Sequence, residues 1–186
     1  MYIIIVGAGK LGYQLSEMFS LKENHVALVD INEEALLKAN SSIDLLTVNA
    51  NGMNLKVLEE LNVNSADMLI AVTSKDETNM LIANLAKKLG CKKVIARIRN
   101  PEHTSQIKFL KEHLCIDYVS NPELEVAKEI GKNVLKSEAV NMEDFAKGRV
   151  GMFEYKLTFA SEWINHPLKD LTLPKRSLIV AVLRDG

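Results

Sequence analysis

The stretch that decides the fold is YIIIVGAGKLGYQL, which occupies residues 2–15. Three isoleucines and a valine follow Tyr2, a composition typical of a strand that is buried on both faces of a parallel sheet. Glycines come next, and apolar residues then recur three or four positions apart from residue 10 to residue 21, which predicts an amphipathic helix. The stretch therefore predicts a strand, a glycine-rich turn and a helix in direct succession.

The turn has the spacing G-x-G-x-x-G, formed by Gly7, Gly9 and Gly12. In this pattern the first glycine permits a tight turn, the second lets the backbone approach a pyrophosphate, and the third lets the helix pack close to the sheet. The helix N-terminus adds free N–H groups and a partial positive charge. We call residues 7–12 the glycine elbow, and we expect it to bind phosphates through Gly7, Gly9, Lys10, Leu11 and Gly12.

An acidic residue, Asp30, ends the next apolar run, which spans residues 25–29. A carboxylate about 20 residues after such a turn accepts hydrogen bonds from ribose hydroxyls. This predicts NAD(H), ATP or ADP as the ligand and disfavours NADP(H), because Asp30 would repel a 2′-phosphate. Two alternatives stay open: the glycines serve only the turn and packing while Asp30 caps the following helix, and Lys10 faces solvent instead of a phosphate.

Segments with strand-like and helix-like patterns alternate along the next hundred residues. This alternation predicts an α/β fold with a Rossmann-like, doubly wound parallel sheet that has helices on both faces. The expected strands are residues 2–6, 25–29, 44–48, 68–72, 94–97 and 117–119, and the expected helices are residues 10–21, 33–40, 55–61, 76–89, 101–113 and a last one from residue 122.

The pattern changes after residue 136. Residues 137–151 mix charged, glycine and small residues without a steady period, which predicts a connector. Residues 152–159 alternate as in a strand, and residues 178–183 suggest another. We therefore expect a nucleotide-binding domain over residues 1–136 and a connector over residues 137–151, followed by a tail over residues 152–186 that is either packed on a partner or cut short.

The composition and the motifs argue against several classes of function. The net charge of −1 gives no general attraction to nucleic acid. No apolar run reaches the roughly 20 residues of a membrane span, and residues 2–6 lack the charged start of a signal peptide, so we expect a cytoplasmic protein without direct membrane insertion. The two cysteines lie far apart and the four histidines are scattered, which predicts neither a disulfide nor a metal site. Leu11 after Lys10 breaks the Walker pattern of ATP-hydrolysing enzymes.

Five motifs occur in a family-specific order: GAGKLG (residues 7–12), LVD (28–30), AVTSKDETNM (71–80), VIARIRNPE (94–102) and SNPELEVA (120–127). In this combination the chain resembles the RCK or KTN regulatory domain of bacterial potassium uptake systems, whose transporter-associated members are the TrkA and KtrA proteins. The tail, with HPLKDLTLP (166–174) and SLIVAVLRDG (177–186), is similar to the opening of the smaller TrkA-C domain of this family, which implies a partial small α+β domain over residues 152–186. The resemblance stops near the midpoint of that domain, so we expect a truncated or split form.

The resemblance also implies roles for residues along the chain. Asp30 matches the acid that binds the ribose, and Arg97 matches a basic residue associated with the phosphates of the ligand. Glu123 matches an acid near the terminal phosphates or a bound cation in members that bind ATP. Thr73, Lys75 and Asp76 lie beside the nucleotide in the family.

The chain departs from the family pattern in two places, and three of the matching residues have simpler explanations. Ala50 and Asn51 stand where the family usually has Gly-Asp, so the expected contact with the adenosine part is a neutral amide. Lys10 stands where ATP-responsive members often have arginine. A lysine ammonium is a point charge and cannot make the two parallel hydrogen bonds that a guanidinium makes to a phosphate. Without a ligand role, Asp76 would be the N-cap of its helix, Arg97 would pair with Glu102, and Glu123 would belong to a helix start.

The function that these patterns favour is a cytoplasmic, non-enzymatic regulatory subunit that senses a nucleotide and gates potassium transport. The resemblance implies a homodimer or higher ring assembly on a membrane potassium transporter of the TrkH or KtrB kind, peripheral to the inner face of the cell membrane. The alternative is an NAD-dependent oxidoreductase, which needs a substrate domain and a proton donor or acceptor near the nicotinamide. The residues beyond the connector are few for that purpose.

Overall fold

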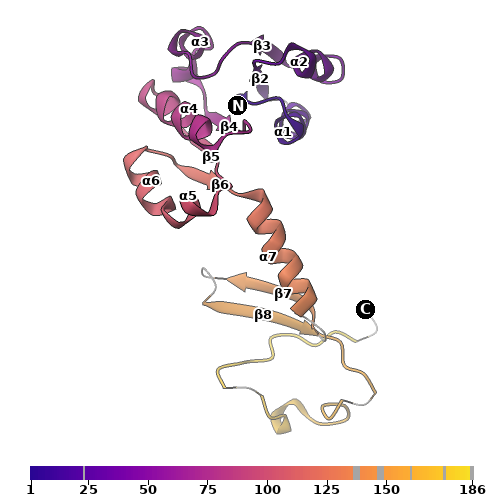
Figure 1. Cartoon of the computed structure of the whole chain (residues 1–186). Coiled ribbons are helices and arrows are strands. Elements are labelled where there is room, and N and C mark those ends of the chain that lie inside the picture. Colours follow the sequence, from indigo (N-terminus) through magenta and orange to yellow (C-terminus); the bar gives the residue numbers. More distant parts are fainter. Residues whose placement is uncertain (23, 136–138, 146–148, 160, 174, 185–186) are drawn as a thin grey trace. The chain divides into compact units, whose positions relative to one another are not determined.

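The structure is a computed structural model that describes residues 1–186 apart from residues 23, 136–138, 146–148, 160, 174 and 185–186 (Figure 1). Contacts divide the chain into unit 1, Met1–Ala127, and unit 2, Lys128–Gly186, and each unit is described by itself. The domain boundary expected after residue 136 falls outside the described residues. It stays a prediction.

Unit 1 is built on a six-stranded sheet in the order β3-β2-β1-β4-β5-β6, and every neighbouring pair is parallel. This is the strand order of a doubly wound dinucleotide-binding fold, so the predicted fold class is confirmed. The strands are β1 Tyr2–Val6, β2 His25–Asp30, β3 Leu46–Asn49, β4 Met68–Ala71, β5 Val94–Arg97 and β6 Tyr118–Ser120.

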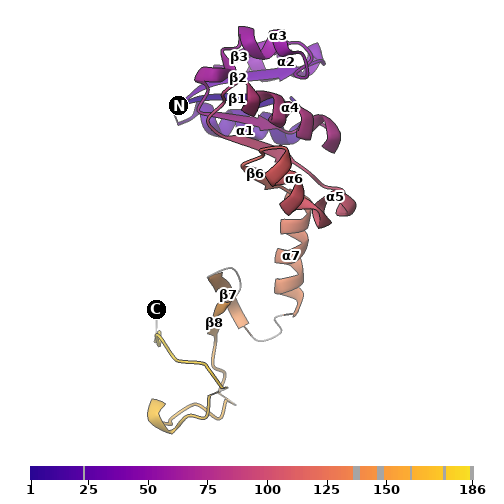
Figure 2. The same cartoon turned by 90° about the vertical axis from the view of Figure 1, so that its left-hand side faces the viewer.

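Helices cover both faces of the sheet, α1 and α2 on one and α3 and α4 on the other (Figure 1). Figure 2 shows the same layers after a turn of 90°. The helices are α1 Lys10–Ser20, α2 Glu33–Asn40, α3 Leu55–Glu60, the 3-10 turn η1 Val63–Ser65, α4 Asp76–Lys88, α5 Pro101–Ser105, α6 Ile107–His113 and α7 Pro122–Leu135.

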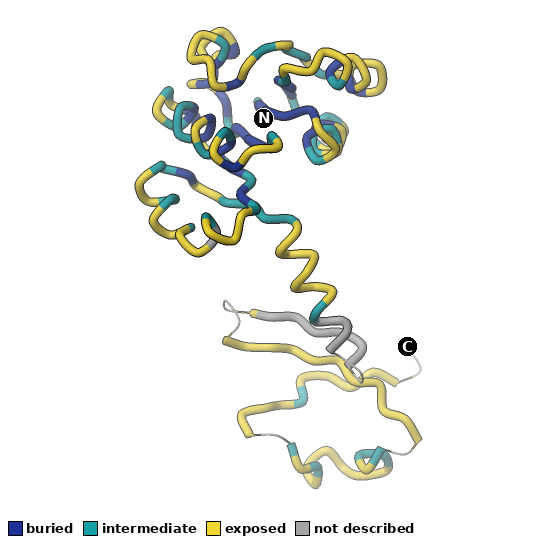
Figure 3. The backbone as a smooth tube through the Cα atoms, viewed as in Figure 1, coloured by how far each residue is buried: buried dark blue, intermediate teal, exposed yellow. Residues whose placement is uncertain are grey.

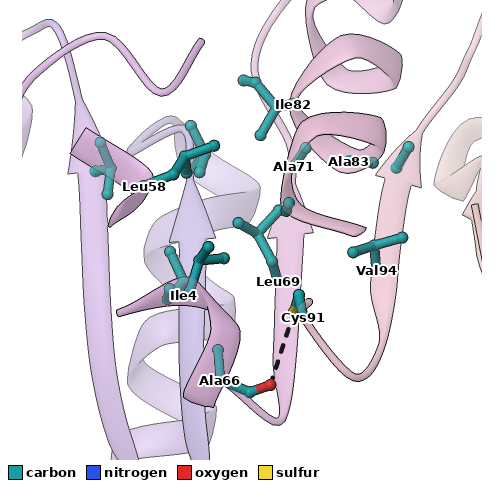
Figure 4. Packing of buried hydrophobic residues seen from close by; sticks show 14 of the residues in the cluster. Ile4, Leu58, Ala66, Leu69, Ala71, Ile82, Ala83, Cys91 and Val94 are labelled. Carbon is teal, nitrogen blue, oxygen red and sulfur yellow. Dashed lines mark hydrogen bonds between the residues drawn. The ribbon is translucent and has the colours of Figure 1, made fainter. Parts of the chain in front are cut away.

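The alternation of side chains along each strand divides the core in two. Ile4 of β1 and Leu69 of β4 pack with Leu58 of α3 and Ile82 of α4 (Figure 4), whereas Ile3 packs on the opposite face with α1 and α2. Because successive strand residues point to opposite faces, an uninterrupted apolar strand such as β1 supplies both cores.

The carboxyl ends of β1 and β4 mark the point at which the strand order reverses. In open α/β sheets, ligands bind in the crevice outside the carboxyl ends of the strands at this point. The glycine elbow follows β1 directly, and the loop that contains Thr73 follows β4. The fold therefore brings two of the predicted site segments to adjacent strand ends.

Apart from shifts of one residue at the ends of several elements, two details of unit 1 differ from the sequence prediction. The single helix expected over residues 101–113 is two helices, α5 and α6, because Gln106 between them leaves the helical range with φ −104° and ψ 10°. β3 covers Leu46–Asn49 instead of residues 44–48, since its register is set by pairing with Ala27 to Asp30 of β2.

Unit 2 contains an antiparallel pair, β7 Ala139–Phe145 and β8 Val150–Tyr155, and the 3-10 turn η2 Leu168–Asp170. The connector expected over residues 137–151 is wrong in its described part, because backbone pairing with β8 makes a strand of a stretch without apolar periodicity. The strand predicted over residues 178–183 is also wrong. No sheet pairing forms among those described residues, and a strand needs a partner for its backbone groups.

Burial differs between the units when each is examined alone. In unit 1 the buried residues follow the strands, whereas every residue of β8 is exposed (Figure 3). Within the described residues, no helix has the length and apolar character required to cross a membrane.

Candidate functional site

The glycine elbow is held in place by contacts that leave no room for side chains at two of its glycines. Gly7 has φ +114°, and a Cβ there would lie 2.8 Å from the backbone carbon of Val72. A Cβ on Gly12 would lie 1.7 Å from the carbonyl oxygen of Gly7. Gly7 thus lets β1 turn against the end of β4, and Gly12 lets α1 pack against the turn.

Gly9 is different, because nothing lies within 4 Å of the place that its Cβ would take. It is the N-cap of α1, and as a glycine it has no side chain to cap the free N–H groups of this helix. The first turn of α1 also contains no acidic residue. It begins with Lys10, which is exposed, and Leu11. An uncapped helix N-terminus with open space above it is a good site for a phosphate.

Asp30 ends β2 beside the elbow, and its carboxylate already has two partners. Oδ2 accepts a hydrogen bond from the Ala8 N–H inside the elbow, and Oδ1 accepts one from the Asn32 N–H at 2.8 Å. Each carboxylate oxygen has two lone pairs, so further acceptor capacity remains for ribose hydroxyls. The two N–H groups therefore fix the orientation of the predicted ribose-binding acid.

Asn51 lies at the edge of the sheet next to Asp30. The Ala50 N–H donates to the Asp30 carbonyl at 3.0 Å, which holds this loop to the end of β2. The Asn51 side chain is exposed, and its Oδ1 accepts a hydrogen bond from the Met53 N–H at 3.0 Å. The amide nitrogen of Asn51 can act as a hydrogen-bond donor, and its contact with the adenosine part of a nucleotide stays a prediction.

Thr73 lies on the other side of the elbow, and Asn79 of α4 holds it. Asn79 Oδ1 accepts hydrogen bonds from the Thr73 N–H at 2.8 Å and from the Thr73 hydroxyl at 2.7 Å. Asn79 is fully buried and was absent from the predicted site. The sequence signal that could have found it is its spacing, because Asn79 stands three, four and seven positions before Ile82, Ala83 and Ala86 of the buried face of α4. Lys75 is the exposed N-cap of α4, with its backbone near the Thr73 hydroxyl.

Asp76 is the first residue of α4 and not its N-cap, and only 6% of it is exposed. Its Oδ2 accepts hydrogen bonds from the N–H groups of Arg99 and Asn100, each at 2.8 Å. Burial by itself would raise the pKa of Asp76, but these N–H groups, His103 and the charge of Arg99 together hold the pKa below its ordinary value. Asp76 thus anchors the segment between β5 and α5, and its predicted contact with nucleotide stays a prediction.

Arg97 ends β5, and its guanidinium contacts the carboxylate of Glu123 in the first turn of α7. The alternative partner, Glu102, is not the one that the structure shows. The Arg97 side chain is 17% exposed, and its Nε is buried without a hydrogen-bond partner among the described residues. A partly buried guanidinium with a spare donor next to an exposed carboxylate can bind a phosphate oxygen.

The predicted site residues form one connected row. Asp30 contacts the elbow through Ala8, the elbow packs on the Val72–Thr73 backbone, and Asn79 joins Thr73 to the Arg97 carbonyl at 2.9 Å. The row crosses the carboxyl ends of β2, β1, β4 and β5, and adjacent strands lie about 4.8 Å apart. It therefore spans about 14 Å from Asp30 to Arg97.

The described residues show no group of three or more histidine, cysteine, aspartate or glutamate side chains that could hold a metal ion. Cys91 is buried in the core, where burial raises the pKa of its thiol (Figure 4). A thiol with a raised pKa is less available as a thiolate. Cys91 therefore serves packing.

Comparison with known proteins gives a consistent family. A model of the TrkA-N domain matches residues 3–122. A Trk system potassium uptake protein TrkA homolog from Archaeoglobus fulgidus is 35% identical over 187 residues, which cover 100% of this chain and 42% of that protein. A TrkA homolog from Pyrococcus abyssi is 31% identical, over 98% of this chain and 81% of that protein. The chain spans less than half the length of several curated relatives.

Solved structures share the fold at low identity. The GsuK channel bound to NAD matches 76% of this chain and 24% of that chain, with a TM-score of 0.59 and 18% identity. A Kef C-terminal domain from Shewanella denitrificans in its AMP-bound form matches 73% of this chain and 80% of that chain, with a TM-score of 0.58 and 19% identity. These likenesses establish the Rossmann-like fold of unit 1.

Proposed function

Since the chain belongs to the TrkA-N domain family, we propose that it is a regulatory subunit that binds a nucleotide at the glycine elbow and thereby controls a membrane potassium transporter. The observation that carries this proposal is the open, uncapped N-terminus of α1 above Gly9, with the Asp30 carboxylate fixed beside it.

The chemistry of the site favours NAD(H), ATP or ADP as the ligand. The free N–H groups of the elbow and Lys10 would bind phosphate oxygens, while Asp30 would accept hydrogen bonds from the ribose. A 2′-phosphate would meet the negative charge of Asp30, so NADP(H) would bind more weakly. Structures of the same fold bind NAD in the GsuK channel and AMP in the Kef domain, which supports this class of ligand.

The far end of the site offers a mechanism for sensing. A phosphate that reaches Arg97 would compete with Glu123 for the guanidinium, because both are anions. Arg97 would then contact Glu123 in the free state and the phosphate in the bound state. A ligand shifts a conformational equilibrium only when it binds the two states with different affinity, and this exchange of partners supplies such a difference.

The remaining parts of the proposal concern the assembly. We propose a homodimer or ring that docks on a potassium transporter at the cytoplasmic face of the membrane, since the relatives are named as Trk potassium uptake proteins. We assign no reaction to the site, because sensing requires binding and release of the nucleotide without chemical change.

Rubidium uptake in cells tests the regulatory role. Cells that lack this chain are complemented with the unmodified chain or with Asp30→Ala, and ⁸⁶Rb⁺ uptake is measured at equal expression. The proposal predicts that the unmodified chain changes the uptake rate and that Asp30→Ala does not reproduce the change. Equal uptake in all three kinds of cell would refute a role in potassium transport.

A further inference from the structure

Asn79 is a polar residue at a core position of α4. It shares a helix face with the buried residues Ile82, Ala83 and Ala86, at the spacing of a core-facing stripe. It is 0% exposed, and a buried amide destabilises the fold unless its hydrogen bonds are satisfied. Because an apolar side chain would avoid this cost, the position indicates a role beyond packing.

All the hydrogen-bonding groups of the Asn79 side chain are engaged. Oδ1 accepts from the N–H and the hydroxyl of Thr73, and the amide nitrogen donates to the Thr73 carbonyl at 3.2 Å and to the Arg97 carbonyl at 2.9 Å. Three of the four bonds hold one residue, Thr73. The fourth joins it to the end of the neighbouring strand.

These bonds begin where the pairing of β4 with β5 ends. The last paired residues of the two strands are Ala71 and Ala96, and both Thr73 and Arg97 lie beyond them. The Asn79 side chain therefore continues the connection between the two strand ends past the ladder. Arg97 carries it one step further, since its guanidinium contacts Glu123 in the first turn of α7.

We propose that Asn79 is a positioning residue that couples the occupancy of the nucleotide site at Thr73 to the Arg97–Glu123 ion pair. This inference rests on the proposed function. A ligand that displaces the backbone or hydroxyl of Thr73 also displaces the amide that holds the Arg97 carbonyl. The coupling is reciprocal, so changes at Glu123 alter nucleotide affinity through the same side chain.

NMR titration of the unmodified chain with NAD, and separately with ATP, tests the coupling without mutation. The signals are the Thr73 amide, the Asn79 side-chain NH₂ and Arg97 Nε–H. The Asn84 side-chain NH₂ is an internal control on the same helix, because it donates to the Leu114 carbonyl at 2.9 Å. We expect the first three to shift with one midpoint while Asn84 stays fixed.

Two other results would overturn the inference in distinguishable ways. A shift of Thr73 without shifts of Asn79 and Arg97 would show binding without coupling, so the proposed function would stand and the inference would fail. No shift of any of the three signals with either nucleotide would overturn both.

A matched pair of variants adds an independent measurement. Asn79→Ala should weaken nucleotide affinity about tenfold and reduce the effect of Glu123→Gln on that affinity, because the link between the sites is lost. Asn84→Ala should leave both unchanged. If Asn79→Ala lowers the melting temperature but leaves the affinity and the Glu123→Gln effect intact, Asn79 is structural only. If it does not fold, the NMR titration decides.

Discussion

At the scale of single residues, the elbow glycines differ in whether the fold itself requires a glycine at the position. Gly12 is required by the fold, because a Cβ would overlap the Gly7 carbonyl oxygen, whereas the space around a Cβ on Gly9 is empty. A glycine that the fold itself does not require, at an uncapped helix start, is consistent with space reserved for a ligand.

This difference gives a paired prediction. Gly9→Ala should lower the free energy of unfolding by at most about 1 kcal/mol, since only its N-cap preference changes, yet it should weaken nucleotide binding. Gly12→Ala should lower the free energy of unfolding by about 3 kcal/mol or prevent folding, because the backbone at Gly7 must move to make room for the Cβ. Urea denaturation and nucleotide titration of both variants check this. Equal loss of stability in the two would contradict the geometry.

Asp76 makes stability depend on pH. Its pKa is lower in the folded protein than in the unfolded chain, so it contributes stability above the unfolded pKa of about 4 that is lost as the pH falls through the folded pKa. Asp76→Asn keeps an oxygen for the N–H groups of Arg99 and Asn100 but removes the charge. We expect its destabilisation at pH 7 to shrink at pH 3, as measured by urea denaturation. A constant difference would exclude a contribution from the charge.

At the scale of elements, the sequence predicted what local pattern determines and missed what pairing determines. The strands β1 and β5 and the helix α2 have the predicted bounds, because apolar runs and caps mark them directly. The break at Gln106 carries no glycine or proline, and β7 is defined by its partner strand. Both depend on tertiary contacts that no local window contains.

In the candidate site, too, the local patterns were predicted and the long-range contacts were missed. The glycine elbow and Asp30 were predicted from spacing, and they lie together in the structure. The bonds of Asn79 to Thr73 and Arg97 were not predicted, because they join residues up to 18 positions apart. Glu123 as the partner of Arg97 was likewise out of reach, since it depends on the pairing of β5 with β6, which brings the start of α7 to the end of β5.

The attachment of β6 to the sheet gives a prediction about one element. Asp117 precedes β6, accepts a hydrogen bond from the Val94 N–H at 2.8 Å and pairs with Lys87 of α4 at 2.8 Å. Asp117→Ala should cost about 1–3 kcal/mol because a partly buried N–H loses its acceptor.

Lys87→Met is the matched comparison. It removes the ion pair and the hydrogen bond from Lys87 Nζ to the Lys92 carbonyl, and both are exposed enough to be screened by solvent, so it should cost at most about 1 kcal/mol. Urea denaturation of both variants measures the two costs. A larger loss for Lys87→Met than for Asp117→Ala would show that the ion pair, and not the backbone bond, holds β6.

At the scale of the whole molecule, every predicted site residue lies within unit 1, since the last of them is Glu123 and the unit extends to Ala127. A fragment of residues 1–127 should therefore fold and bind nucleotide within about threefold of the affinity of the whole chain, a difference below 1 kcal/mol. Titration of the fragment beside the whole chain measures this. Loss of binding by a folded fragment would mean that unit 2 contributes to the site.

The most direct test of the account is isothermal titration of the whole chain at fixed salt with NAD, NADH, NADP, ATP and ADP. It is repeated with Asp30→Ala and with Asp44→Ala, a control at an exposed aspartate of the same unit. The account predicts that NAD(H) or an adenine nucleotide binds, that NADP binds more weakly, and that Asp30→Ala abolishes binding while Asp44→Ala preserves it. Absence of binding by any nucleotide, or unchanged binding by Asp30→Ala, would contradict it.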